Sequence, residues 1–308
     1  MRNAFADEIT RLAPEDPRLV LLSGDIGNKL FDKFKAAGPG RFFNCGVAEA
    51  NMMGVAAGMA LSGLRPVIYT ITPFTTTRCY EQIRVDVCYH RAPVIIVGTG
   101  SGLSYAELGP THHSCEDLAI LRVLPGMTVL APGDSNELRQ LLRAALRQDG
   151  PVYMRIGKKG EPAILPDGAP PLVIGQAARL RDGADVCLIG CGTVLSEVLK
   201  AADLLASRGI QARVESFHTV KPLDTAALDD AFRRYPLVAV CEEHSRLGGL
   251  GSAIAEWRCE QPGTPGALLS IAVDDTFMHE VGTQEYARRR FGIDADSIAA
   301  RVAGALRR

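Results

Sequence analysis

Short apolar runs alternate with stretches of helical spacing along the first half of this chain, and this alternation constrains the fold more than any other feature. Each run is apolar at consecutive positions, which is typical of a strand covered on both faces. Strands of this kind, separated by helices, form parallel sheets with helices on both sides. The predicted strands are residues 19–23, 65–69, 94–98, 128–131 and 151–155, and the predicted helices are residues 5–12, 80–87, 116–122 and 136–147, with a further helix after Glu49.

Residues 158–171 interrupt this pattern because they hold too many prolines and glycines for a regular helix or strand. We interpret this segment as a linker between domains. The sequence therefore predicts two doubly wound α/β domains, residues 1–165 and a smaller domain at residues 172–308. In the second domain the predicted strands are residues 185–189, 211–215 and 237–240, and the predicted helix is residues 194–208.

The composition is that of a globular protein, with 308 residues of which 47% are hydrophobic and 22% are charged. Its 34 basic and 35 acidic residues leave a formal charge of −1, which provides no electrostatic attraction for nucleic acid or anionic lipid. No apolar run approaches the roughly 20 residues of a membrane span, and the polar residues 1–8 are unlike a signal peptide. We therefore expect a cytoplasmic protein without a nucleic-acid or membrane partner. The eight cysteines form no Cys-x-x-Cys pair, and we interpret them as packing thiols.

Glu49 is a single carboxylate at the start of an otherwise apolar helical segment. Burying an isolated carboxylate is costly unless the group is protonated or hydrogen bonded. Two interpretations are therefore open. Glu49 is either a solvated first-turn residue, favoured there by the helix dipole, or a buried group that meets a specific partner.

Four segments are candidate active-site loops because each lies where a predicted strand is followed by a helix, and parallel α/β sheets usually bind ligands there. They are residues 24–29, the segment around Glu49, residues 70–74 and residues 98–113. The last segment is long, polar and rich in glycine, which is typical of a functional loop. Its glycines do not complete a dinucleotide-binding fingerprint, so we interpret them as a flexible turn.

Two kinds of side chain in these loops indicate chemistry. His112 and His113 are adjacent, so their side chains diverge, which disfavours a shared metal site and favours one histidine as a proton donor or oxyanion partner. Phe74 is the aromatic residue of a threonine-rich loop. It either fills the core or stacks on a flat heterocycle, and we favour stacking when Phe74 is considered together with Glu49.

Several motifs taken together resemble the transketolase family. The resemblance covers nearly the whole chain and is closest to split transketolases, in which the C-terminal half is a separate polypeptide. The matching segments are residues 45–51, 78–84, 109–113 and 121–127 for the pyrimidine-binding domain, and residues 217–224 and 242–251 for the C-terminal domain.

The resemblance implies a thiamine diphosphate site. By this resemblance, Glu49 hydrogen-bonds N1′ of the aminopyrimidine and promotes the tautomer that takes the proton from the thiazolium C2. Phe74 would stack on the pyrimidine ring. The other implied cofactor-binding residues are Ile71, Arg78 and Asp25, of which Asp25 would lie at a subunit contact near the cofactor.

The resemblance also implies a substrate channel. His112 would line it and, as a second catalytic residue beside Glu49, would stabilise developing oxyanion charge. Arg2 and Lys158 would anchor a substrate phosphate. The full set of implied substrate-binding residues is Arg2, Lys29, Gly100, Leu108, His112 and Lys158.

A partner subunit is implied as well. Transketolases hold the diphosphate and Mg²⁺ on a separate domain with a Gly-Asp-Gly motif and a downstream Asn, and residues 24–28 of this chain only mimic that motif. The implied partner is an N-terminal, diphosphate-binding subunit that holds Mg²⁺. The implied assembly contains two copies of each chain (α2β2).

Two departures from the family pattern bear on the substrate. Sugar-using transketolases usually carry an Asp that contacts a sugar hydroxyl where this chain has Leu108, and often a phosphate-contacting His where it has Gly100. A missing hydrogen-bond partner in a polar site changes substrate preference by orders of magnitude. We hypothesise that a relaxed, less polar loop suits an unphosphorylated or less hydroxylated acceptor.

Three functions are compatible with these features. The first is a transketolase subunit that moves a two-carbon ketol unit from a ketose to an aldehyde. The second is a decarboxylating thiamine enzyme, either the β subunit of a 2-oxo acid dehydrogenase or a relative of deoxyxylulose phosphate synthase. The third is a non-catalytic scaffold. Residues 109–112 fit the transketolase pattern better than the dehydrogenase pattern, and the presence of Glu49, Phe74 and His112 argues against a scaffold.

Overall fold

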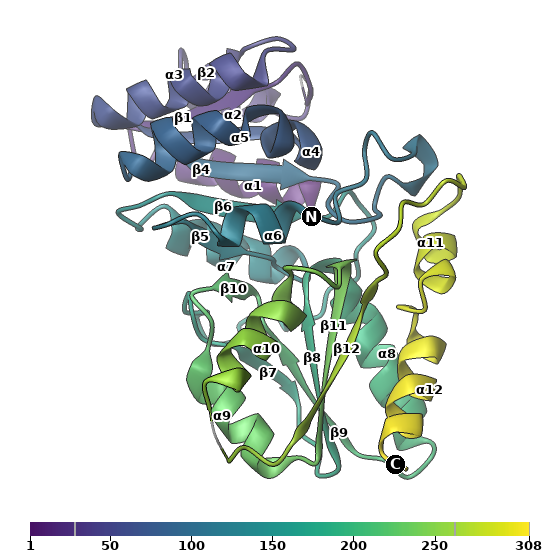
Figure 1. Cartoon of the computed structure of the whole chain (residues 1–308). Coiled ribbons are helices and arrows are strands. Elements are labelled where there is room, and N and C mark those ends of the chain that lie inside the picture. Colours follow the sequence, from purple (N-terminus) through teal and green to yellow (C-terminus); the bar gives the residue numbers. More distant parts are fainter. Residues whose placement is uncertain (28, 262, 308) are drawn as a thin grey trace.

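The chain folds into two α/β units, each built on its own sheet, which lie one above the other in Figure 1. The computed structural model describes residues 1–27, 29–261 and 263–307. Asn28, which belongs to the segment that mimics a diphosphate-binding motif, lies outside the described residues. The predicted fold class, two wound α/β domains, is confirmed.

The first sheet has seven strands in the order β10-β5-β6-β4-β3-β1-β2. Neighbouring strands are parallel, apart from β10, which is antiparallel to β5. The inner strands are almost fully buried, as their apolar sequences predict. The strands are β1 Leu19–Ser23, β2 Phe42–Asn44, β3 Arg65–Ile71, β4 Ile95–Thr99, β5 Thr128–Leu130, β6 Val152–Ile156 and β10 Thr219–Lys221.

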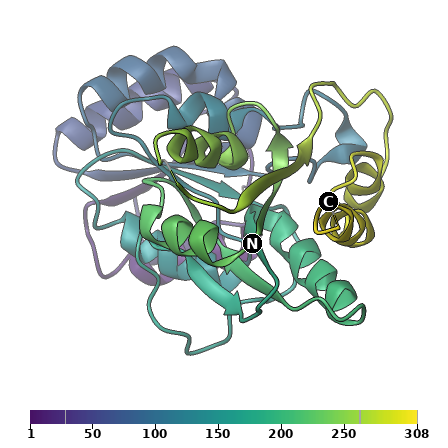
Figure 2. The same cartoon turned by 60° about the horizontal axis from the view of Figure 1, so that its bottom comes forward.

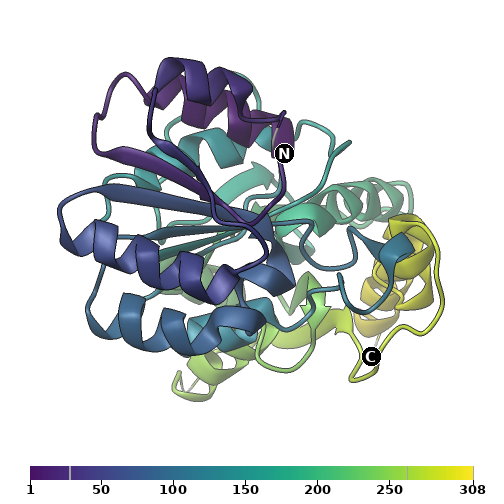
Figure 3. The same ribbon diagram turned by 90° about the horizontal axis from the view of Figure 1, so that it is seen from above.

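Helices cover both faces of this sheet, with α1 on one face and α3 on the other (Figure 3). Alternate strand residues point to opposite faces, so Leu21 and Val67 pack in the α1 core while Leu22 and Ile68 pack in the α3 core. The helices are α1 Arg2–Leu12, α2 Asp32–Ala37, α3 Glu49–Leu61, α4 Thr72–Thr75, α5 Tyr80–Gln82, which continues as a π-helix over Ile83–Tyr89, α6 Asp117–Arg122 and α7 Ser135–Ala145.

The second sheet has five strands in the order β12-β11-β8-β9-β7, of which only the edge strand β7 is antiparallel to its neighbour. Helices α8 and α12 pack together on one side of it, next to α11 (Figure 2). The strands are β7 Ala178–Arg181, β8 Val186–Cys191, β9 Ala212–Ser216, β11 Leu237–Ser245 and β12 Ala267–Val273, and the helices are α8 Leu195–Ala206, α9 Thr225–Arg234, α10 Leu250–Cys259, α11 Gln284–Arg290 and α12 Ala295–Ala305.

The two units share structure across the proline-rich linker. Strand β10 comes from the second half of the chain, yet it extends the first sheet by pairing with β5. One continuous apolar core joins residues of α3 and α6 with residues of β8 and α10. The two units are therefore packed together along an extensive buried surface.

Several local predictions are confirmed and others are wrong. The strands predicted from apolar runs all form, although β11 is longer than expected. The helix predicted over residues 80–87 is largely a π-helix, and residues 72–75 form a short helix where we expected a loop. All eight cysteines are free, and five are buried as packing thiols while Cys259 is exposed. Among the described residues, no helix is long and apolar enough to cross a membrane.

Candidate active site

Glu49 is buried, with 5% of its surface exposed, at the first turn of α3. The solvated interpretation is therefore wrong, because β1 and β3 end beside the side chain. A β-carbon placed at Gly24, just after β1, would lie 3.3 Å from Thr70 Oγ1 and 3.5 Å from Glu49 Cγ. The Thr70 hydroxyl is buried and has no hydrogen-bond partner among the described residues. The carboxylate thus lies in a small, partly polar recess at the carboxyl edge of the first sheet.

Arg78 connects Glu49 to Phe74. Its Nη1 lies 3.4 Å from Glu49 Oε1, and its Cζ lies 3.8 Å from the centroid of the Phe74 ring. The Arg78 side chain is 47% exposed, so this contact is made at the mouth of the recess. The short helix α4 places Phe74 there. The structure therefore brings together three of the residues that the resemblance implies at the cofactor.

The other two predicted cofactor residues lie further along the same edge. Ile71 is half-buried and is the last residue of β3. Asp25 is exposed in the turn after β1, with a left-handed φ of 54°, and its Oδ1 accepts a hydrogen bond from Asn44 Nδ2 at 3.0 Å. Asp25 has no described contact with Glu49 or Phe74.

His112 lies beside Phe74, with the two ring centroids 5.3 Å apart in an edge-to-face arrangement. Its Nδ1 is 2.9 Å from Thr111 Oγ1. Burial and, to a smaller extent, the charge of Arg78 lower the pKa of His112 below the usual value of an imidazole. A neutral ring is therefore expected at neutral pH. His113 instead lines a separate cavity of about 360 Å³ next to Asp274, so the two side chains diverge as predicted.

Tyr105 is a residue of this site that the sequence analysis missed. Gly100 has a φ of +73°, and a β-carbon there would lie 1.8 Å from Tyr105 Cε2, so the ring occupies the space that a side chain at position 100 would fill. The centroids of the Tyr105 and His112 rings are 5.9 Å apart. The expectation of a relaxed loop at Gly100 is therefore wrong, because Tyr105 packs tightly against that glycine. One aromatic residue in a glycine-rich loop was the signal that could have found it.

Charged residues surround Tyr105. The Lys158 Nζ lies 4.4 Å from the centroid of the Tyr105 ring and forms an ion pair with Glu107. Arg2, at the start of α1, has a buried Nε without a hydrogen-bond partner among the described residues. Burial raises the pKa of Tyr105, while Lys158 and Arg2 oppose this rise. Of the two predicted phosphate anchors, Lys158 therefore lies over the Tyr105 ring, and the charge of Arg2 acts on the Tyr105 hydroxyl.

Two predicted substrate residues are less closely involved. Leu108 is 49% exposed and ends the single helical turn that follows Tyr105. Lys29 is exposed between β1 and α2, where its carbonyl accepts a hydrogen bond from Asp32 N–H at 3.4 Å. No described contact joins Lys29 to Glu49, Phe74 or His112.

The fold and this recess define a two-unit α/β protein with a buried carboxylate at the carboxyl edge of its first sheet. Residues 1–161 match the family described as transketolase, pyrimidine binding domain, and residues 175–298 match the family described as transketolase, C-terminal domain. The chain therefore belongs to the transketolase family.

Individual relatives agree with this assignment. The chain is 38% identical to the 6-deoxy-6-sulfo-D-fructose transketolase subunit of Clostridium sp. strain MSTE9, over 97% of this chain and 92% of the relative. It is 33% identical to an apulose-4-phosphate transketolase subunit of Phocaeicola vulgatus, over 96% of this chain and 94% of the relative. It is 37% identical to the 1-deoxy-D-xylulose-5-phosphate synthase of Thermomicrobium roseum, over 98% of this chain but only 48% of that enzyme.

A solved structure is similar over almost the whole chain. It is described as a split gene transketolase, inactive beta4 tetramer, and it superposes with a TM-score of 0.89 at 35% sequence identity, covering 99% of this chain and 97% of the other. This chain therefore has the architecture of the C-terminal section of a split transketolase.

Proposed function

We propose that this chain is the pyrimidine-binding subunit of a two-chain transketolase that transfers a two-carbon ketol unit from a ketose to an aldehyde. The observation that carries the proposal is the buried Glu49 carboxylate next to Phe74, at the edge where parallel sheets bind ligands. The family assignment supports the reaction class, because the Clostridium and Phocaeicola relatives are named as transketolase subunits.

The recess fits the aminopyrimidine of thiamine diphosphate. Its buried carboxylate, the unpartnered Thr70 hydroxyl and the Phe74 ring offer one acid, one neutral hydrogen-bonding group and one aromatic face. When bound, the cofactor supplies the covalent chemistry on the substrate carbonyl. Glu49 would hold a proton at the ring nitrogen N1′, and Phe74 would orient the ring, with Ile71, Arg78 and Asp25 along the same edge.

His112 would act on the substrate. Its ring is half-buried and, because its pKa is lowered, it is neutral at neutral pH. A neutral imidazole donates one N–H hydrogen bond, and such a donor stabilises a carbonyl oxygen as charge develops on it. The Phe74 and Tyr105 rings flank the imidazole, with centroids 5.3 and 5.9 Å from it, and would hold its orientation.

We propose that the diphosphate and Mg²⁺ are held by an N-terminal partner subunit and that the active assembly is α2β2 in the cytoplasm. Residues 24–28 lack the complete motif that transketolases use for the diphosphate, which supports this division. The solved relative is described as an inactive tetramer of β chains, which also supports a need for the partner.

The substrate proposal follows from the loop around Tyr105. Leu108 offers no hydrogen bond to a sugar hydroxyl, and Tyr105 fills the space above Gly100. Lys158, which lies over the Tyr105 ring and pairs with Glu107, and Arg2, whose charge acts on the Tyr105 hydroxyl, are the cations of this part of the site. These features support a non-standard ketose or aldehyde, and the relatives named for sulfofructose and apulose 4-phosphate act on such sugars. Lys29, which is exposed, would contact substrate only at the outer edge of the site.

The similarity to deoxyxylulose phosphate synthase makes decarboxylation the second candidate. The test is to reconstitute the chain with its candidate N-terminal partner, thiamine diphosphate and Mg²⁺, and to compare ketose donors with pyruvate in the presence of aldehydes. Ketol transfer without release of carbon dioxide supports the proposal. Release of carbon dioxide from pyruvate, with no ketol transfer from any ketose, would contradict it.

A further inference from the structure

The loop that carries Tyr105 and His112, residues 100–115, is attached at both ends to the second domain. We call it the His112 loop. Near its start, Leu103 N–H donates a hydrogen bond to Glu243 Oε1 at 2.7 Å. At its end, Ser245 N–H donates to the carbonyl of Cys115 at 2.7 Å. Figure 1 shows this loop running beside the segment that leads into α11. The two attachments come from one short stretch at the end of β11.

The two ends of the His112 loop are also joined to each other. Gly102 and Ser114 exchange two backbone hydrogen bonds of 3.0 and 2.9 Å. Arg155, which is buried at the end of β6, donates through Nη2 to the carbonyls of both Ser114 and Glu243, at 3.0 and 2.9 Å. The base of the loop and the end of β11 therefore form one connected set of hydrogen bonds.

Glu243 is the centre of this set. Its side chain is 1% exposed and accepts hydrogen bonds from two residues of α11 as well as from Leu103. Arg288 Nε lies 2.6 Å from Oε2, and Gln284 Nε2 lies 2.8 Å from Oε1. Gln284 also reaches Ser104 Oγ at 3.3 Å. A buried carboxylate with this many donors is held in one position, because moving away from any donor would leave part of its negative charge buried without a hydrogen bond.

Gly102 lets the loop approach Glu243 closely. A β-carbon there would lie 2.6 Å from Glu243 Oε1 and 2.8 Å from the Glu243 carbonyl oxygen, and the φ of +63° is itself a glycine conformation. Three residues beyond, Tyr105 packs over Gly100 and towards His112. The position of Glu243 therefore sets where the active-site part of the loop begins.

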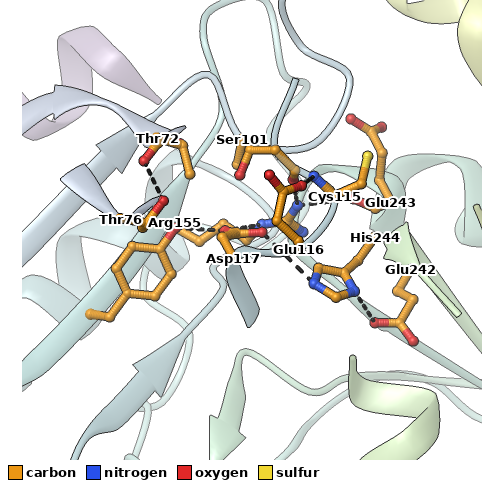
Figure 4. A network of polar contacts seen from close by, with 12 residues as sticks. Thr72, Thr76, Ser101, Cys115, Glu116, Asp117, Arg155, Glu242, Glu243 and His244 are labelled. Atoms are coloured by element: carbon orange, nitrogen blue, oxygen red, sulfur yellow. Dashed lines mark hydrogen bonds and ion pairs between the residues drawn. The ribbon is translucent and has the colours of Figure 1, made fainter. Parts of the chain in front are cut away.

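The preceding residue, Glu242, makes contacts of a different kind. It is also fully buried, but its carboxylate accepts hydrogen bonds from Leu250 N–H and Gly251 N–H, both at 2.8 Å, at the start of α10. In Figure 4, Glu242 lies beyond His244, away from Asp117 and Arg155. The two adjacent buried glutamates thus accept hydrogen bonds from different elements. Glu242 accepts them from the start of α10, and Glu243 accepts them from the His112 loop and from α11.

We propose that Glu243 is a positioning residue through which the second domain fixes the His112 loop, and with it Tyr105 and His112. The importance of the loop for catalysis rests on the proposed function, whereas the effect on loop order does not. The second domain then has a specific role in the active site of the first, beyond packing against it.

The first test is hydrogen–deuterium exchange on the assembled wild-type enzyme and on two variants with the same change, Glu243→Gln and Glu242→Gln. Glu243→Gln is expected to increase exchange at least tenfold in residues 101–114, with β8 unchanged. Glu242→Gln should increase exchange at the start of α10 and leave the loop unchanged. Equal exchange in the loop of both variants, or no increase in either, would overturn the proposal.

Kinetic measurements on the same assemblies separate a loss of loop positioning from a general loss of native structure. Glu243→Gln is expected to raise KM for the substrates about tenfold, with the Kd of thiamine diphosphate changed less than twofold. Arg288 would keep an ion pair with Glu197 at 3.8 Å, but loss of the Glu243 charge could still prevent folding, and a second variant covers that case. Gln284→Met removes one donor to Glu243 at a half-exposed position, and it should raise KM about threefold with the same small change in the Kd of thiamine diphosphate. A change in cofactor Kd equal to the change in KM would contradict the proposal. Absence of ketol transfer in the wild type would contradict the proposed function, while exchange in the loop would still decide the role of Glu243.

Discussion

The guanidinium of Arg78 covers one face of the Phe74 ring, with Cζ 3.8 Å from the ring centroid. A flat heterocycle can stack on this face only if Arg78 moves aside, and the 47% exposure of Arg78 leaves room for that movement. Such a contact between a cation and an aromatic ring contributes about 1 kcal/mol at an exposed site. Arg78 can therefore cover the ring in the free chain and yield to a ligand at small cost.

Arg78 also acts on His112, and this gives a first prediction. Burial, followed by the positive charge of Arg78, lowers the pKa of His112. Arg78→Met removes the charge that disfavours the imidazolium, so the pKa of His112 should rise towards that of a free imidazole. NMR titration of the ring protons measures this, with His112→Gln to assign the signal among the six histidines. If the titration midpoint of His112 is unchanged or lower in Arg78→Met, the positive charge of Arg78 does not act on His112.

Glu49→Gln should abolish most of the activity without affecting the assembly. The change keeps the size of the side chain but removes the acid that is proposed to hold a proton at the pyrimidine, and proton transfer of this kind typically contributes about 10²- to 10⁴-fold. Turnover of the reconstituted enzyme and its mass by light scattering test both parts. Glu81→Gln, at an exposed position on α5, is the matched control and should keep full activity. Full activity in Glu49→Gln would remove the basis of the cofactor assignment.

Gly100→Ala should lower stability by about 1 to 3 kcal/mol, because the new β-carbon collides with Tyr105 and the backbone has a positive φ. The collision can be separated from the backbone strain by a double-mutant cycle. In a Tyr105→Ala background the same substitution should cost clearly less, as measured by urea unfolding. Equal costs in both backgrounds would mean that Tyr105 does not occupy the space above Gly100.

His244 should make the protein less stable in acid. Its Nδ1 lies 2.8 Å from the Ser245 carbonyl and its Nε2 accepts Ala119 N–H at 3.3 Å, so the buried ring is neutral. Burial lowers the pKa of His244 to about 4, with Arg155 acting in the same direction and the charge of Asp117 opposing it. The unfolded chain, with a pKa near 6.5, binds the proton first as the pH falls, so stability contributed by the neutral ring is lost between about pH 6.5 and 4.

The measurement for this prediction is a pair of urea unfolding series. The advantage of wild type over His244→Gln should shrink by roughly 1.4 kcal/mol per pH unit as the pH falls from 6.5 towards 4. The difference between the two proteins isolates His244 from buried groups that do not contact it, such as Glu137, whose pKa is raised to about 7 by burial. A difference that stays constant with pH would contradict a neutral, buried His244.

The sequence predicts the strands that are buried on both faces and misses the four strands at the sheet edges. Strands β1, β3 and β4 have continuous apolar runs, whereas β2, β7 and β12 are partly exposed and carry a mixed pattern. β10 has three residues and depends on pairing with β5, far away in the chain. Such strands are defined by their neighbours in space, which a local pattern does not contain.

The residues of the site also divide into those with a local sequence signal and those that depend on tertiary contacts. Glu49 and Phe74 stand out because each is unusual in its local sequence, and the structure places them together through Arg78. Tyr105 has only a weak local signal, as an aromatic residue in a glycine-rich loop, and Glu243 has none. Tyr105 folds back over a glycine five residues earlier, and Glu243 reaches a loop 140 residues away. Their roles depend on tertiary contacts, so only the structure reveals them.

We propose that this chain supplies the pyrimidine half of a site that is completed by a partner. Titration calorimetry with thiamine diphosphate and Mg²⁺, on the chain alone and on the chain mixed with its candidate N-terminal half, tests it most directly. We predict binding only in the mixture, and weaker binding when Phe74→Ala is used in place of wild type. Tight binding to the chain alone would show that the diphosphate site lies on this chain and would contradict a site shared with a partner.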